Sequence, residues 1–178
     1  GTELIFESKL NGASRARRKR AMERVLNGVA RISHLPAYFD KESNVKSKVI
    51  GKIPDEAAIR ARYDSEEQKL NPRQIIAFQR AVSEGPIGIL QGPPGTGKTD
   101  FVTKLIHYLF EHEIAGNILL VGQSHASVDT VAIKARELFS EIGSDISVVR
   151  LGHESATDDQ MLQCHSSSIQ RQIRYKFQ

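Results

Sequence analysis

The sequence predicts an α/β fold in which a mostly parallel sheet is flanked by helices. Three observations indicate it: short apolar runs alternate with amphipathic helical patterns, a glycine-rich loop follows the first run, and turn residues separate the remaining elements. The 178 residues suffice for one such domain with additional segments. Because the elements follow the order strand, helix, strand, right-handed crossovers should make neighbouring strands parallel.

The N-terminal part, residues 1–69, is predicted to be a basic, mostly helical segment with a linker. Residues 1–60 hold 13 Lys and Arg against 7 Asp and Glu, whereas the rest of the chain holds 12 against 14. Helical spacing of apolar residues predicts helices over 14–31 and 55–68, and 40–52 is interpreted as a linker or weak strand. This charge asymmetry is a mild indication of a polyanionic partner.

Residues 70–155 are predicted to form the N-terminal part of the sheet domain. Its first helix should begin with Asn71 as cap, Pro72 at the first helical position and Gln74 at the third. Apolar runs of strand length predict buried strands at 87–90, 118–121 and 146–151. Residues 156–178 are polar and are predicted to end in a helix.

The composition excludes several kinds of protein. Its single cysteine, Cys164, rules out an internal disulfide framework and fits a reducing compartment, so we expect a cytoplasmic protein. No apolar run approaches the ~20 residues of a membrane span, so no membrane association is expected. Four histidines show no metal-ligand spacing and are predicted to lie on the surface: His107, His112, His153 and His165.

A phosphate-binding loop is the most specific motif in the chain. Eight consecutive residues match G-x-x-x-x-G-K-[ST] in full: Gly92, Pro93, Pro94, Gly95, Thr96, Gly97, Lys98 and Thr99. Glycines let backbone N–H groups approach an anion, and the helix that follows directs its positive end at that anion. Lys98 would reach the β- and γ-phosphates, Thr99 would bind Mg²⁺, and Asp100 completes the predicted ATP-binding residues.

The flanks of this loop resemble a particular helicase family. The loop string GPPGTGKT is shared by AAA+ ATPases and superfamily 1 helicases, and the segments around it favour the helicases. Residues 70–74 resemble the helicase Q motif, 119–129 resemble motif Ia, and 148–152 resemble the next strand, V-x-R-L-G. The combination resembles the superfamily 1 branch that includes the nonsense-mediated decay helicase and its bacterial relatives. It implies a RecA-like P-loop NTPase domain.

The resemblance implies further binding residues. Gln74 would read the adenine edge, although the same amide could instead bond back to Asn71 as part of a helix cap. Ser124 and His125 would contact the backbone of single-stranded DNA or RNA, although Ser124 could simply cap its helix. The family usually has Asn where this chain has His125, and often Thr where it has Phe101.

The residues for hydrolysis are incomplete. Lys98 and Thr99 are the predicted catalytic residues, but no Asp-Glu pair follows an apolar run to bind Mg²⁺ and orient water. Since the chain begins with Gly1, we interpret it as a piece of a longer helicase, ending before Walker B, partnered by the remainder of that parent. Such a piece is expected not to turn over ATP efficiently by itself. Two alternatives stay open: an AAA+ ATPase that remodels proteins, and a non-catalytic nucleotide-binding switch.

Overall fold

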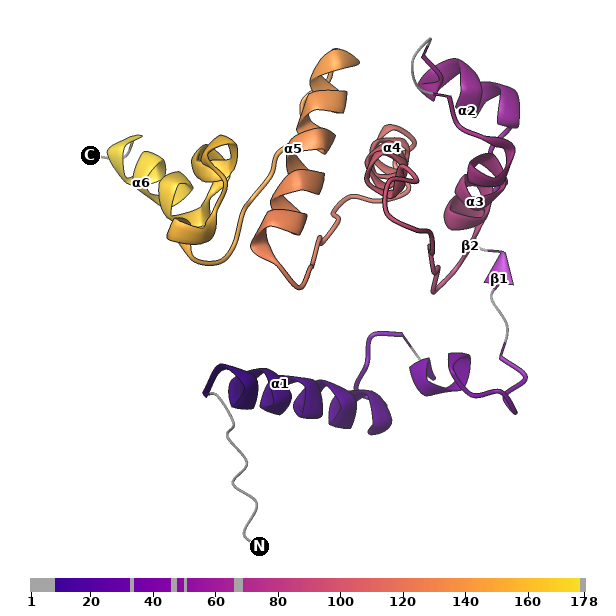
Figure 1. Cartoon of the computed structure of the whole chain (residues 1–178), viewed down its shortest axis with the longest axis horizontal. Helices are drawn as coiled ribbons and strands as arrows, with labels where there is room; N and C mark the ends of the chain where they lie inside the picture. The colour runs from indigo at the N-terminus through magenta and orange to yellow at the C-terminus, as the bar shows by residue number, and fades with distance from the viewer. Residues whose placement is uncertain (1–8, 33, 46–47, 50, 66–68, 177–178) are drawn as a thin grey trace, which may run out of the picture. The chain divides into compact units, whose positions relative to one another are not determined.

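The computed structural model describes residues 9–32, 34–45, 48–49, 51–65 and 69–176. Its elements in chain order are α1 (Lys9–Leu26), η1 (Leu35–Tyr38), β1 (Lys48–Val49), α2 (Glu56–Tyr63), α3 (Pro72–Ser83), β2 (Glu84–Gly85), α4 (Lys98–Glu111), α5 (His125–Glu141), η2 (Glu154–Ala156), η3 (Asp159–Cys164) and α6 (Ser166–Lys176) (Figure 1). The two strands pair with each other. In these ranges, no helix combines the length and apolar character needed to cross a bilayer.

The chain divides into two compact units, residues 1–49 with 85–87 and residues 50–84 with 88–178. In the first unit, α1 ends at Leu26 because Gly28 adopts φ +70 and its N–H bonds back to the Val25 carbonyl, a common way for glycine to stop a helix. The predicted helix is therefore confirmed, but it ends earlier than residue 31. The basic side chains of α1 from Arg15 to Arg20 are mostly exposed.

Helices α2 and α3 begin the second unit. The Asn71 side chain accepts a hydrogen bond from the Gln74 N–H, and the Gln74 side chain accepts one from the Asn71 N–H, so the predicted capping box is confirmed. Helix α2 stops short of the predicted residue 68 because the Asp64 carboxylate turns to accept the Leu70 N–H at 2.8 Å. This turn returns the chain so that α3 packs against α2.

Phe78 is the centre of the hydrophobic core of this unit. Its side chain is fully buried, and its ring contacts Tyr63 of α2 and Phe101 and Tyr108 of α4. Burying an aromatic side chain of this size stabilises the fold by about 3 kcal/mol. The core therefore fixes α4, whose first residues carry the predicted phosphate loop, against α2 and α3.

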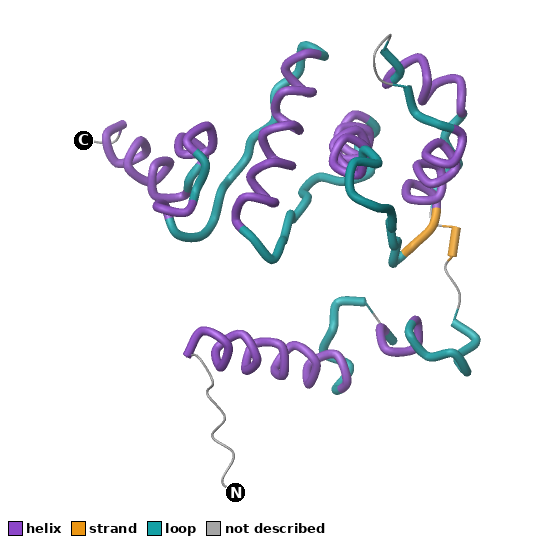
Figure 2. Tube along the Cα trace, viewed as in Figure 1, coloured by secondary structure: helices purple, strands orange, loops and turns teal. Residues whose placement is uncertain are grey.

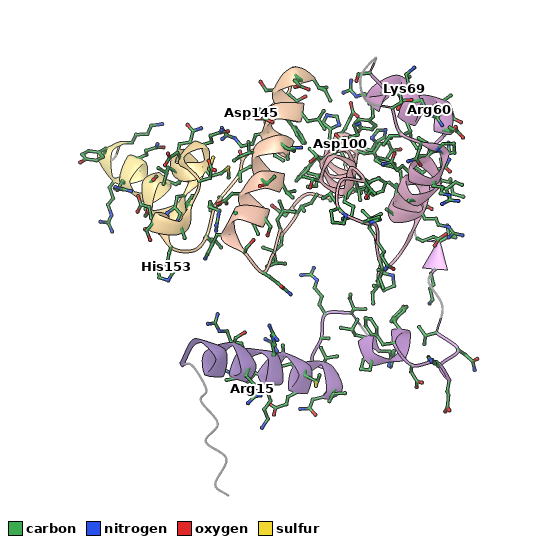
Figure 3. All side chains as sticks on the ribbon, viewed as in Figure 1. Arg15, Arg60, Lys69, Asp100, Asp145 and His153 are labelled. Atoms are coloured by element: carbon green, nitrogen blue, oxygen red, sulfur yellow. The ribbon has the colours of Figure 1, made fainter. Side chains whose placement is uncertain are left out.

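Two histidines occupy the interior, so their predicted surface placement is wrong. His107 on α4 is 1% exposed; its Nδ1 lies 2.9 Å from the Tyr63 hydroxyl, and its ring packs against Phe139 of α5. Burial lowers the pKa of His107 and raises that of Tyr63. His165 is 4% exposed. The surface placement of His112 and His153 is confirmed, and Figure 3 labels His153 on the loop before η2.

The predicted parallel sheet is not formed by the described residues. Segments 87–90, 118–121 and 146–149 run as loops (Figure 2), and the only ladder contact among the predicted strands is an isolated parallel bridge between Arg150 and His165. A strand needs a hydrogen-bonded neighbour, and the described residues supply none beside these segments. A cavity of about 840 Å³ lies between two of them and helices α4 and α5. Apolar side chains consequently remain exposed, 79% for Leu119 and 85% for Val121.

Candidate nucleotide and phosphate sites

Two glycines of the loop before α4 adopt a left-handed backbone conformation. Gly95 has φ +77 and Gly97 has φ +74, both in the left-handed region that favours glycine. Gly97 is the N-cap of α4, so Lys98 is already the first helical residue. The first N–H groups of a helix have no acceptors within it, and a turn of this kind directs successive N–H groups into one concavity. The loop residues therefore fit a polyanion.

Lys98 lies over this loop. Its ammonium donates to the carbonyl oxygens of Gly92 at 2.7 Å and Pro93 at 2.6 Å. The Thr96 hydroxyl donates to the same Pro93 oxygen at 2.8 Å. Because an ammonium has three N–H donors, two carbonyl contacts leave the third for a phosphate oxygen.

Thr99 and Asp100 lie in the first turn of α4. The Thr99 carbonyl accepts a hydrogen bond from the Thr103 hydroxyl at 2.8 Å. The Asp100 carboxylate pairs with Lys104, whose side chain is 6% exposed, at 2.9 Å. Asp100 is labelled on α4 in Figure 3. Its closest charged partner is thus the buried Lys104, and its predicted contact with ATP stays a prediction.

Gln74 connects the start of α3 to the phosphate loop. Its Oε1 accepts from the Asn71 N–H at 2.9 Å, and its Nε2 donates to the Thr96 carbonyl at 3.3 Å. The capping alternative is therefore what the structure shows. The second bond places the Gln74 amide at the loop itself, 3.5 Å from the position that a Cβ on Gly97 would take.

Ser124 and His125 lie together at the start of α5. Ser124 is the N-cap, and its hydroxyl accepts from the Ser127 N–H at 3.2 Å, so its capping role is present. His125 is the first helical residue and is exposed. Within the described part of the chain, no hydrogen bond joins either residue to the phosphate loop, so the two predicted sites are separate groups of residues.

Two charged residues behind His125 have no predicted role from the sequence. Arg150 is 6% exposed and Asp129 is 2% exposed, and they form a salt bridge through Arg150 Nε and Asp129 Oδ1. Burial opposes ionisation of Asp129, but hydrogen bonds from Arg150 and the Asp158 N–H, together with the Arg150 charge, lower its pKa. Asp129 is the last residue of the motif Ia segment, and Arg150 is the arginine of the V-x-R-L-G segment. Their place in these two segments was the sequence signal that could have pointed to them.

Comparison with known proteins shows the family to which this chain is similar. Residues 69–178 match the sequence model of a protein family that is described as AAA domain. Regulator of nonsense transcripts 1 of Dictyostelium discoideum is 34% identical over 85 residues, 47% of this chain. ATP-dependent helicase NAM7 of Saccharomyces cerevisiae is 36% identical over 91 residues, 51% of this chain. The DNA replication ATP-dependent helicase/nuclease dna2 of Schizosaccharomyces pombe is 32% identical over 109 residues, 61% of this chain.

These relatives are far longer than the chain, which spans 6%, 8% and 7% of their respective lengths. No solved structure gives a significant match. The family match covers the whole region from α3 to α6, including the phosphate loop and the start of α5. The chain therefore belongs to the AAA domain family, a P-loop NTPase family, and residues 69–178 are part of a superfamily 1 helicase motor domain.

Proposed function

We propose that the loop Gly92–Thr99 binds MgATP. The observation that carries this proposal is the position of Lys98, whose ammonium is held over the loop by two carbonyl oxygens with one donor to spare. Lys98 would bond to the β- and γ-phosphates, the N–H groups of the loop would surround them, and the Thr99 hydroxyl would bind Mg²⁺. Bound Mg²⁺ would neutralise charge on the β- and γ-phosphate oxygens.

Gln74 reads adenine in this proposal without giving up its cap. An amide oxygen has two lone pairs and an amide nitrogen has two N–H donors. One lone pair of Oε1 accepts from Asn71, and one N–H of Nε2 donates to the Thr96 carbonyl. The remaining lone pair and N–H match the donor at adenine N6 and the acceptor at N7. The cap would thus orient the amide for the base, and the two roles do not compete.

The parent protein would be an ATP-dependent helicase or translocase that acts on single-stranded DNA or RNA. Relatives whose names state helicase activity support this reading over a protein-remodelling ATPase or a switch. Ser124 and His125, at the exposed start of α5, would contact a backbone phosphate. Cys164, a free thiol among the described residues, supports a reducing compartment such as the cytoplasm.

Titration of the 178-residue chain with a fluorescent ATP analogue, with and without Mg²⁺, tests the nucleotide site. Lys98→Ala should weaken binding about 100-fold, because a hydrogen bond to a charged group is lost together with the charge. Thr99→Val should remove the dependence on Mg²⁺. Lys134→Ala, which removes an equal charge from an exposed position of α5, is the matched control and should bind normally. Equal affinities for the Lys98→Ala and Lys134→Ala chains would contradict the proposal.

A further inference from the structure

The start of α5 is held by a buried group of polar side chains. The Arg150 guanidinium donates to Asp129 with Nε and Nη2, to the Leu151 carbonyl with Nη1, and to His125 Nδ1 at 3.0 Å with Nη2. Asp129 also accepts from the Asp158 N–H at 3.2 Å. The backbone of Arg150 is fixed as well, since its N–H donates to the Cys164 carbonyl at 2.8 Å. Arg150 is thus restrained at both its backbone and its side chain.

These contacts determine which nitrogen of His125 carries the proton. A guanidinium has only donors, so the ring nitrogen that it contacts must supply a lone pair. Nδ1 of His125 is therefore the acceptor, and the hydrogen of the neutral ring is on Nε2. A proton on Nδ1 would place two N–H groups against each other beside a positive charge. The contact with Arg150 thus occupies Nδ1 and leaves Nε2 as the donor of an exposed side chain.

Gly152 makes this approach of ring and guanidinium possible. A Cβ at this position would lie 3.1 Å from Arg150 Nη1 and 3.3 Å from His125 Cε1, closer than most side chains tolerate. The residue also has φ +134, which side-chain-bearing residues rarely adopt. The glycine that ends the V-x-R-L-G string is therefore explained by the contact between Arg150 and His125.

We propose that Asp129 and Arg150 are positioning residues that fix His125 as an Nε2–H donor for a nucleic-acid phosphate. This inference rests on the proposed function, which assigns the phosphate contact to His125. Asp129 orients the guanidinium, the guanidinium selects the tautomer, and the tautomer presents a neutral donor beside the free N–H groups of α5. An asparagine amide, which the superfamily 1 pattern has at this position, offers the same kind of N–H donor.

The tautomer can be measured by NMR on the ¹⁵N-histidine-labelled chain. Long-range ¹H–¹⁵N spectra distinguish the two ring nitrogens, and loss of one signal set in His125→Asn assigns His125. We expect the Nε2–H tautomer in the unsubstituted chain, and averaged signals from both tautomers in Arg150→Met. Averaged signals or an Nδ1–H tautomer in the unsubstituted chain would overturn the inference, and this outcome depends on no variant except His125→Asn, a change at an exposed position that is used for assignment.

Binding of a fluorescein-labelled 20-nucleotide oligo(U) or oligo(dT), followed by anisotropy, tests the donor. His125→Ala should weaken binding about tenfold, and His125→Asn should restore most of that loss, because it restores an N–H donor. Gly152→Ala, which displaces the ring without removing a charge, should weaken binding as His125→Ala does. Unchanged binding in His125→Ala, with the Nε2–H tautomer observed, would overturn the donor role. Failure of the unsubstituted chain to bind either oligonucleotide would instead overturn the proposed nucleic-acid function.

Discussion

Helices α4 and α5 both begin at a loop and both are proposed to meet phosphates, yet their starts are built differently. The contacts at the start of α4 are mostly local: Gly97 caps it, and Lys98 reaches the carbonyls of Gly92 and Pro93, six and five residues away. Gln74 of α3 adds a longer-range bond to the Thr96 carbonyl. The start of α5 depends on distant residues, because His125 is held by Arg150, 25 residues further along the chain.

This difference explains what each site demands of the fold. The loop before α4, shaped by its glycines and its own lysine, needs α4 and the Gln74 end of α3 in place, and the Phe78 core packs these two helices together. The α5 start also needs the segment around Arg150 to be in place, and that segment is held by its bonds to Cys164 and Ser166. The nucleotide site should therefore tolerate changes that abolish order at the α5 start.

The largest expected effect is a loss of stability on substitution of Arg150, which holds the start of α5. Arg150→Met leaves the Asp129 carboxylate buried without its charged partner, which should destabilise the fold by about 3–5 kcal/mol. Arg171→Met, which breaks an ion pair with Glu154 between side chains 59% and 45% exposed, should cost far less, because solvent screens exposed charges. Urea unfolding measures both. Similar losses for the two variants would show that the Arg150 pair is not buried in solution.

The next effect concerns Gln74 of α3, whose amide contacts the loop before α4. Gln74→Ala should reduce the preference for ATP over GTP about tenfold, since it removes the groups that would read adenine. Asn71→Ala disrupts the same cap but keeps the amide, so it should retain the preference. Competition titrations with the two nucleotides measure the ratio. An identical ratio for Gln74→Ala and the unsubstituted chain would assign Gln74 to the cap alone.

Removing side-chain caps compares the starts of α3 and α5. Asn71→Ala at α3 and Ser124→Ala at α5 each remove a side chain that accepts from a backbone N–H, so each should destabilise by about 1 kcal/mol. We expect the Ser124 variant to weaken oligonucleotide binding and the Asn71 variant to leave it unchanged. Urea unfolding and anisotropy together separate the effects, and equal oligonucleotide affinities would remove Ser124 from the proposed interface.

The smallest effect is a pH dependence of stability from His107. Because burial lowers its pKa in the folded chain, the unfolded chain takes up the proton first as the pH falls. Neutral His107 therefore makes its full contribution to stability above about pH 6.5, the ordinary pKa of imidazole in an unfolded chain. This contribution is lost as the pH falls below that value. His107→Gln should reduce the change in urea midpoint between pH 7.5 and about 6, whereas exposed His153→Gln should not. If the urea midpoint changed equally with pH in both variants, a group other than His107 would cause the pH dependence.

Local patterns predicted the helices well and long-range contacts poorly. The capping box at Asn71 and the helix after the phosphate loop depend on residues within a few positions, and both are confirmed. The burial of His107 depends on Tyr63 and Phe139 from other helices, which spacing along the chain does not reveal. The strands were predicted from apolar composition, but composition states only that a segment should be buried, and pairing depends on neighbours.

The same apolar loops affect how this chain behaves in a concentrated solution. Leu119 and Val121 lie exposed in a segment that takes part in no strand pairing within the described residues. Segments of this kind join edge to edge with copies from other molecules, which leads to aggregation. A lysine in place of Val121 would interrupt such stacking, and light scattering against concentration would register the gain in solubility.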